Sequence, residues 1–177
     1  MDLKAIVLEE HSKAQTMRIV RYIGNDPNRF GELMALYFDE NNRISQRASW
    51  PAGYCAVAHP ELIYPYLKKM VSQLDLPVHN AIKRNTTRIL AEIDIPEELL
   101  GEVADLCFRF LDDPKEAIAV RAFSMSVCFN ITRREPELAN ELKIILEDHF
   151  PHSSAGFKAR AKRILKELGK METNKQS

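Results

Sequence analysis

Residues 78–93 read VHNAIKRNTTRILAEI, and this stretch decides the expected fold. Its apolar and small residues recur at steps of three and four, which places them on one side of an α-helix with about 3.6 residues per turn. The residues on this side are Val78, Ala81, Ile82, Asn85, Thr86, Ile89, Leu90 and Ile93. We therefore predict an amphipathic helix here, with Arg84 and Arg88 on a face that is offset from the buried stripe.

The same register returns 37 residues before and after this stretch. Arginine marks it at Arg47, Arg84, Arg121 and Arg160, which are 37, 37 and 39 residues apart. Proline followed by glutamate opens an apolar-periodic segment after three of these repeats, at Pro60, Pro96 and Pro136. Repeat periods of about 20 to 50 residues indicate stacked supersecondary units, and a unit without strand signals indicates a pair of helices.

The remaining segments complete the expected architecture. Partner helices are predicted at 28–38, 61–73, 97–111 and 137–150, because each stretch is amphipathic and three of them begin near a proline–glutamate pair. We expect an all-α, right-handed superhelix of about four helix pairs after an N-terminal capping segment between residues 3 and 24. Residues 1–169 should form a single helical repeat domain, and the polar residues 170–177 should be disordered.

Composition limits the class of protein. The chain has 177 residues, of which 45% are hydrophobic and 28% charged, and its 25 basic and 25 acidic side chains give a formal net charge of +0. It contains no apolar run of about 18 residues and no secretory signal pattern, so we expect a soluble cytoplasmic protein. Cys55, Cys107 and Cys128 lie within apolar helical patterns, which predicts buried thiols and neither a disulfide framework nor a zinc site.

The stretch from Asp113 to Ala122, DPKEAIAVRA, resembles the aspartate, Val-Arg and following alanine of HEAT repeats, the two-helix units of importin-like solenoids. Asp75 with Arg84, Asp39 with Arg47, and residues 158–161 match more loosely. The resemblance extends over residues 28–168, although the spacing from aspartate to arginine is longer than the usual family pattern. It implies that aspartate and arginine form an internal ladder between stacked units.

The repeated arginines therefore have two interpretations. In the ladder they would be structural, whereas an open row on the inner helix layer could bind carboxylates or phosphates through paired hydrogen bonds. Trp50 and Tyr54 follow Arg47 at steps of three and four and share one helix face. Tryptophan, tyrosine and arginine are enriched at binding hot spots, although Trp50 could instead fill space beside the small residues of its own helix.

From these patterns the sequence favours a non-catalytic helical-repeat scaffold that binds a protein or peptide partner on its concave inner-helix surface. A stack of helix pairs exposes an extended surface and has no deep central cavity. The candidate contact residues are Arg47, Trp50, Tyr54, Arg84, Arg88 and Arg121.

Nucleic-acid binding is the first alternative, because HEAT-like alkylation-repair glycosylases share the expected fold. Residues 121–177 contain 11 basic and 7 acidic side chains. The cations that would bind phosphates in this alternative are Lys158, Lys162, Arg163 and Lys166. A chain without net charge lacks the strong overall field that usually accompanies phosphate binding.

An enzyme is the remote alternative. Residues 152–158, HSSAGFK, are superficially similar to the signature loop of adenylosuccinate lyases, but the methionine-proline and lysine-any-asparagine-proline that continue that loop are replaced here. Ser153 and Ser154 are better interpreted as caps of the final helix. The sequence shows no glycine-rich phosphate loop and no zinc-spaced cysteine pairs, so no metal, cofactor or catalytic residue is predicted.

Overall fold

A computed structural model describes residues 2–175 and the side chains up to residue 171. Every regular element within residues 2–175 is helical, which confirms the predicted all-α class. The chain divides into two compact units, Met1–Ile95 and Pro96–Ser177, where a single domain over 1–169 was expected. Each unit is described by itself.

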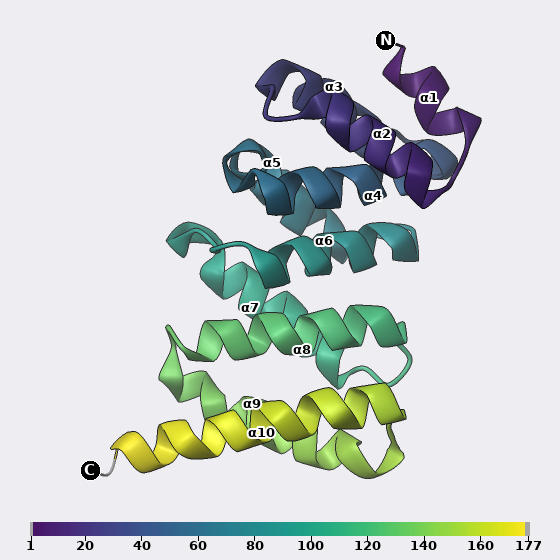
Figure 1. Cartoon of the computed structure of the whole chain (residues 1–177). Helices are drawn as coiled ribbons and strands as arrows, with labels where there is room; N and C mark the ends of the chain where they lie inside the picture. The colour runs from purple at the N-terminus through teal and green to yellow at the C-terminus, as the bar shows by residue number, and fades with distance from the viewer. Residues whose placement is uncertain (1, 176–177) are drawn as a thin grey trace. The chain divides into compact units, whose positions relative to one another are not determined.

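Residues 2–95 of the first unit form six α-helices, whose arrangement Figure 1 shows. They are α1 (Leu3–Glu9), α2 (Lys13–Ile23), α3 (Pro27–Tyr37), α4 (Asn42–Ala58), α5 (Tyr64–Ser72) and α6 (Asn80–Glu92). Two short 3₁₀ helices flank α5, namely η1 (Pro60–Leu62) and η2 (Gln73–Asp75). The pairs α3/α4 and α5/α6 are the first two predicted repeats, and α1 and α2 form the predicted capping segment.

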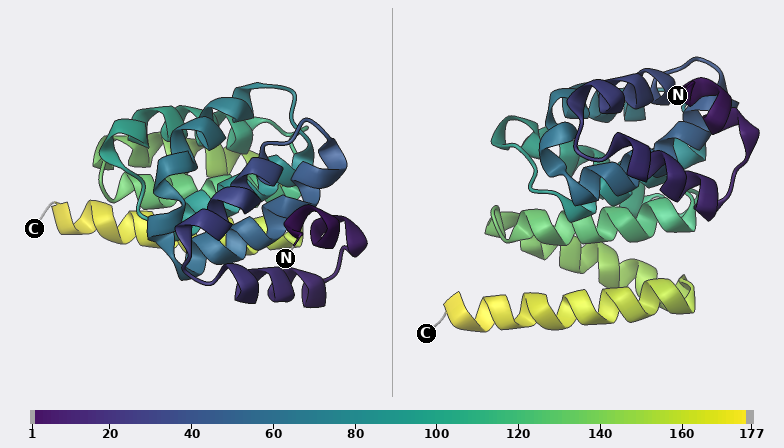
Figure 2. Two further views of the ribbon diagram at one scale, coloured as in Figure 1. Left: turned by 90° about the horizontal axis from the view of Figure 1, so that it is seen from above. Right: turned by 45° about the horizontal axis from the view of Figure 1, so that its top comes forward.

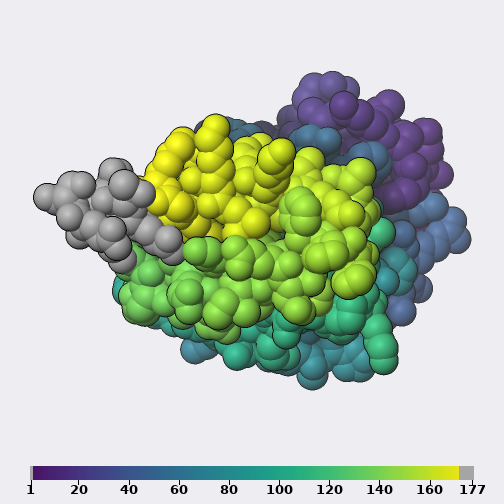
Figure 3. Space-filling model, turned by 90° about the horizontal axis from the view of Figure 1, so that it is seen from below, coloured from purple at the N-terminus to yellow at the C-terminus, as the bar shows by residue number. Residues whose placement is uncertain are grey.

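The second unit contains the last two helix pairs. They are α7 (Glu97–Asp112) with α8 (Ile118–Thr132), and α9 (Ala139–His149) with α10 (Ala155–Lys175). The 3₁₀ helices η3 (Pro136–Leu138) and η4 (Phe150–His152) precede and follow α9. Within this unit α8 and α10 lie side by side (Figures 1 and 2), and α9 and α10 form the face that Figure 3 shows.

One expectation about the C-terminus differs from the structure. Residues 170–177 were expected to be disordered, but α10 continues to Lys175. Leu168 is buried in the turn before this extension, so packing anchors the helix just ahead of the polar residues. Residues 176 and 177 lie outside the described residues.

Short polar side chains start several of these helices. Asp2, Ser12 and Asn41 accept a hydrogen bond from a backbone N–H in the first turns of α1, α2 and α4, at 3.0, 3.1 and 3.0 Å. These caps satisfy N–H groups that have no partner inside the helix. Gly24 ends α2 with a φ of 55°, in the left-handed region that favours glycine, and its N–H bonds Val20 O at 2.9 Å.

Helix α4 packs against α1, α2, α3 and α6. Small side chains permit this number of neighbours, because Ala48, Ala52 and Ala56 are fully buried along one stripe. Pro51 lies inside α4, which nevertheless runs without interruption from Asn42 to Ala58. The stripe places Trp50 and Tyr54 on a half-buried face of the same helix.

A buried polar contact fixes α6 against α4. Asn85 is 2% exposed, and its Nδ2 donates a 2.7 Å hydrogen bond to Ser49 Oγ, which in turn donates to Gln46 O at 2.7 Å. Tyr37 of α3 makes a second polar contact with α6 through the hydroxyl of Thr86, and burial raises the pKa of Tyr37. Because such groups have no access to water, each hydrogen bond that is lost leaves an unsatisfied polar atom.

We predict that Asn85→Ala lowers the free energy of unfolding by about 1–3 kcal/mol, since it removes this buried amide and its hydrogen bond. Asn80→Ala is the matched control, because Asn80 is exposed in the first turn of the same helix. Its effect should stay within about 0.5 kcal/mol. Denaturant titration followed by circular dichroism measures both, and equal stability of the two variants would contradict the assigned role of Asn85.

Candidate functional site

The repeated arginines do not form the predicted ladder with aspartates. Arg47 of α4 donates from Nη1 to Leu8 O at 2.7 Å, in the last turn of α1. Arg121 of α8 donates from Nε to Leu111 O at 3.0 Å, in the last turn of α7. A cation at a helix C-terminus is stabilised by the unpaired carbonyls and by the helix dipole, so backbone oxygens take the place of the expected carboxylates.

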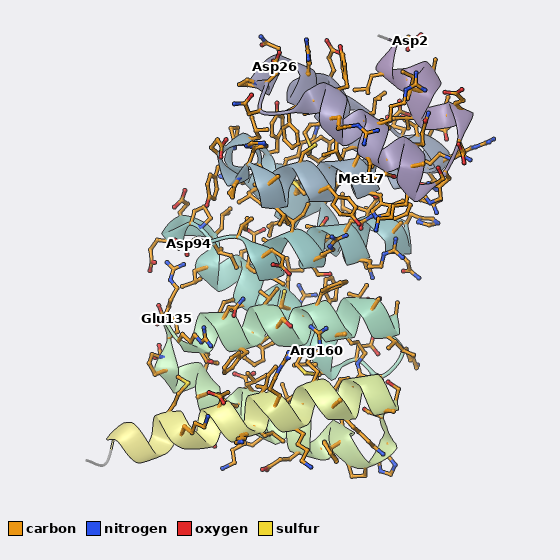
Figure 4. The ribbon with its side chains drawn as sticks, in the orientation of Figure 1. Asp2, Met17, Asp26, Asp94, Glu135 and Arg160 are labelled. Carbon is orange, nitrogen blue, oxygen red and sulfur yellow. The ribbon has the colours of Figure 1, made fainter. Side chains whose placement is uncertain are left out.

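Arg160 also binds backbone, but at a different place. Its Nη1 donates to Ala122 O at 3.2 Å and to Ser126 Oγ at 2.6 Å, so the side chain reaches from α10 to α8 (Figure 4). The register predicted a common position for the four arginines, and three of them connect helices within a unit. Their acceptors are backbone carbonyls and one serine hydroxyl, whereas aspartate carboxylates were predicted.

Arg121 is a core residue. Its side chain is only 8% exposed, and its guanidinium carbon lies 4.9 Å from the centre of the Phe157 ring. Burial lowers the pKa of Arg121, and the carboxylates of Asp113 and Asp112 oppose that change. The structure thus gives Arg121 a packing role in the second unit, apart from the other predicted contact residues.

Arg84 differs from the other three repeated arginines, and it lies one helical turn before Arg88 on α6. Arg84 is exposed and Arg88 is half-buried. The guanidinium carbon of Arg88 lies 4.7 Å from the centre of the Tyr54 ring, which is a cation–π contact between α6 and α4. Among the residues that the structure describes, neither guanidinium is paired with an acidic side chain.

Trp50 of α4 contacts a residue that was not predicted as part of a site. The His11 ring, in the link between α1 and α2, lies 5.5 Å from the Trp50 ring, measured between ring centres. The pKa of His11 lies below its ordinary value, because partial burial disfavours the imidazolium and because Arg47 and Arg84 repel it. This link lies outside the repeats, so the arginine spacing gave no signal for His11.

The structure therefore brings together five of the six predicted contact residues and adds one histidine, all within the first unit. We call this group the arginine–aromatic surface. It consists of His11, Arg47, Trp50, Tyr54, Arg84 and Arg88. The surface combines two rings that keep part of their area accessible with cations that lack acidic partners in the described chain.

The residues of the nucleic-acid alternative lie on α10 in the second unit. Lys162, Arg163 and Lys166 are exposed, whereas Lys158 is half-buried with its Nζ 6.0 Å from the centre of the Phe150 ring. Spacings of four residues place the three lysines along one side of the helix. This face contains no aromatic ring at the positions between the lysines, unlike the arginine–aromatic surface.

The thiols are confirmed as buried and free. Burial raises the pKa of Cys55 and of Cys107 to about 12 and raises that of Cys128 well above its ordinary value. Such thiols remain protonated and are poor nucleophiles at neutral pH.

Within residues 2–175, no group of three or more histidine, cysteine, aspartate or glutamate side chains is arranged to hold a metal ion. None of the helices described in this range has the length and apolar content needed to cross a lipid bilayer.

Helix pairs that recur with one register and place arginines at equivalent positions define a helical-repeat protein. A family model described as the HEAT repeat domain matches residues 3–168. The chain therefore belongs to the HEAT repeat family. No curated protein and no solved structure shows a significant match.

Proposed function

We propose that this protein is a non-catalytic scaffold that binds a protein partner through the arginine–aromatic surface of its first unit. The observation that supports this proposal most directly is the stacking of Arg88 on Tyr54 beside unpaired Arg84. Rigid aromatic rings with a cation over one face offer a large contact area together with directional hydrogen-bond donors. A location in the reducing cytoplasm is part of the proposal, and three free thiols support it.

Catalysis is less well supported by the same residues. Arginine, tryptophan and tyrosine stabilise a bound chain, but none of them is an effective proton acceptor near neutral pH. His11 is the one imidazole of this surface, and partial burial together with Arg47 and Arg84 lowers its pKa. It lies against a ring and not against a nucleophile, so its geometry favours contact with a partner.

Selection from a library of random peptides tests the proposal with a defined probe. We expect the wild-type protein to enrich a consensus sequence that the Trp50→Ala/Arg88→Ala variant fails to enrich, because the variant lacks one aromatic anchor and one stacked cation. Helical circular dichroism should be unchanged, since both side chains are only half-buried.

The Lys162→Ala/Arg163→Ala variant is the control, because it removes two exposed cations of α10, outside the arginine–aromatic surface. This variant should enrich the same consensus as the wild type. Enrichment of identical peptides by the Trp50→Ala/Arg88→Ala variant would remove the arginine–aromatic surface from the proposed function.

A further inference from the structure

The arginine–aromatic surface carries a local excess of positive charge. Arg84 and Arg88 have no acidic neighbour paired with them in the described chain, and Arg47 donates to backbone carbonyls that carry no formal charge. Arg47 and Arg84 both repel the imidazolium of His11, which after burial is the cause of its lowered pKa. A ligand with carboxylates would relieve this repulsion and gain charge-assisted hydrogen bonds.

The spacing of the cations fits an extended chain. Arg84 and Arg88 are four residues apart on α6, so their Cα atoms are separated by about 6 Å along the helix axis. In an extended segment, side chains on one side repeat at about 6.6 Å, which is every second residue. Carboxylates at alternate positions of such a segment would therefore each face one arginine.

Stacking leaves Arg88 able to bind a carboxylate. The guanidinium carbon of Arg88 lies over the Tyr54 ring, 4.7 Å from its centre. The N–H donors of a guanidinium lie in the plane of the group and point outward from its edge. Stacking also restricts the rotamers of the side chain, so less conformational entropy is lost when a carboxylate binds. Arg88 is thus an oriented donor.

The aromatic residues fit the positions between the carboxylates. Trp50 and Tyr54 are also four residues apart, on the neighbouring helix α4, and therefore repeat at the same distance as the two arginines. Side chains of an extended segment alternate between two sides. Apolar residues between the acidic ones would face these rings.

The charge of the first unit argues against a polyanion as the ligand. Residues 1–95 contain 12 lysine and arginine residues and 11 aspartate and glutamate residues. Nucleic-acid binding generally uses several phosphate contacts along a basic surface. A short peptide with two or three carboxylates needs only the local cations.

We propose that the arginine–aromatic surface binds an extended protein segment in which acidic and apolar residues alternate, with Arg84 and Arg88 pairing with successive carboxylates. This inference rests on the proposed function and specifies the chemistry of the partner. Arg47 connects α4 to α1, and His11 packs against Trp50. Trp50 and Tyr54 contact the apolar residues of the segment.

Titration with defined peptides tests the inference, and the chain supplies its own reporter because Trp50 is the only tryptophan. The peptide Glu-Leu-Glu-Leu-Glu-Leu should change the Trp50 emission and bind with an affinity that falls with added salt. The isosteric peptide with glutamine at each glutamate should bind at least about tenfold more weakly, since it keeps the shape but lacks the charges. The pKa of His11, followed by NMR and assigned with His11→Asn, should rise when the acidic peptide binds.

Several outcomes would overturn the inference. They are equal affinity for the glutamine peptide, no binding of either peptide, an unchanged pKa of His11 in the complex, and displacement of the acidic peptide from this surface by a DNA duplex. A library consensus that depends on Trp50 and Arg88 but contains no acidic residue would overturn this inference and leave the proposed function standing. Absence of any such consensus would reject the proposed function itself.

Discussion

Charge reversal in the Arg84→Glu/Arg88→Glu variant should weaken binding of the alternating acidic peptide by at least about 100-fold, which corresponds to about 2.7 kcal/mol. Two attractive pairs become two repulsions, and like charges facing each other in an interface cost several kcal/mol. Fluorescence polarisation of a labelled peptide measures the change. The variant should keep its helical circular dichroism, because Arg84 is exposed and Arg88 half-buried.

The matched control changes the net charge by the same amount at another place. Lys162→Glu/Arg163→Glu reverses two exposed cations on α10, so its effect on net charge equals that of the first variant. Its affinity for the acidic peptide should remain within about twofold of the wild type, because long-range effects of exposed charges are screened at physiological salt. A similar loss in both variants would show that only the overall charge of the chain matters.

A compensating peptide makes the test specific. The Arg84→Glu/Arg88→Glu variant should bind Lys-Leu-Lys-Leu-Lys-Leu more tightly than the wild type does, because the sign of each pair is restored. Loss of acidic binding without this gain would indicate that the substitutions disturbed the contact between Arg88 and Tyr54 instead of a charge pair. A preference that switches from the acidic to the basic peptide in the variant identifies charge pairing, whatever the size of the change in affinity.

The helices were predictable because their signals are local. The predicted stripe residues within α6 lie on its buried side. They are Ala81, Ile82, Asn85, Thr86, Ile89 and Leu90. Helix boundaries were harder to predict, since 3₁₀ turns such as η1 and η3 replace the expected first turns after Pro60 and Pro136. Proline starts both kinds of turn, so the sequence does not separate them.

The partners of the arginines were not predictable to the same degree. An aspartate can be read from the sequence, whereas a backbone carbonyl at the end of a helix exists at every helix end and has no residue signature. His11 was missed for a related reason, because it reaches Trp50 from a link of the capping segment that does not repeat. Periodicity thus predicts which residues share a face but not how deeply each one is buried.

Arg84 and Arg121 show this limit most clearly, and substitution by alanine should separate them. They occupy equivalent positions 37 residues apart, yet Arg84 is exposed and Arg121 is 8% exposed. Arg121→Ala should lower the free energy of unfolding by about 2–4 kcal/mol. It removes the hydrogen bond to Leu111 O, leaves that buried carbonyl without its donor, and removes a long buried side chain whose guanidinium lies over the Phe157 ring. Arg84→Ala should change stability by no more than about 0.5 kcal/mol.

Arg121→Met distinguishes packing from hydrogen bonding at this position. Methionine retains an apolar stem of similar length, so it should recover part of the loss by packing against Phe157 while Leu111 O stays without its donor. Denaturant unfolding followed by circular dichroism ranks the stabilities of the variants. Peptide affinity should be unchanged in Arg121→Ala and reduced in Arg84→Ala, which lacks one of the two proposed carboxylate pairs. If Arg121→Ala were as stable as the wild type, or if it abolished peptide binding while the fold persisted, Arg121 would belong to a contact surface and not to the core.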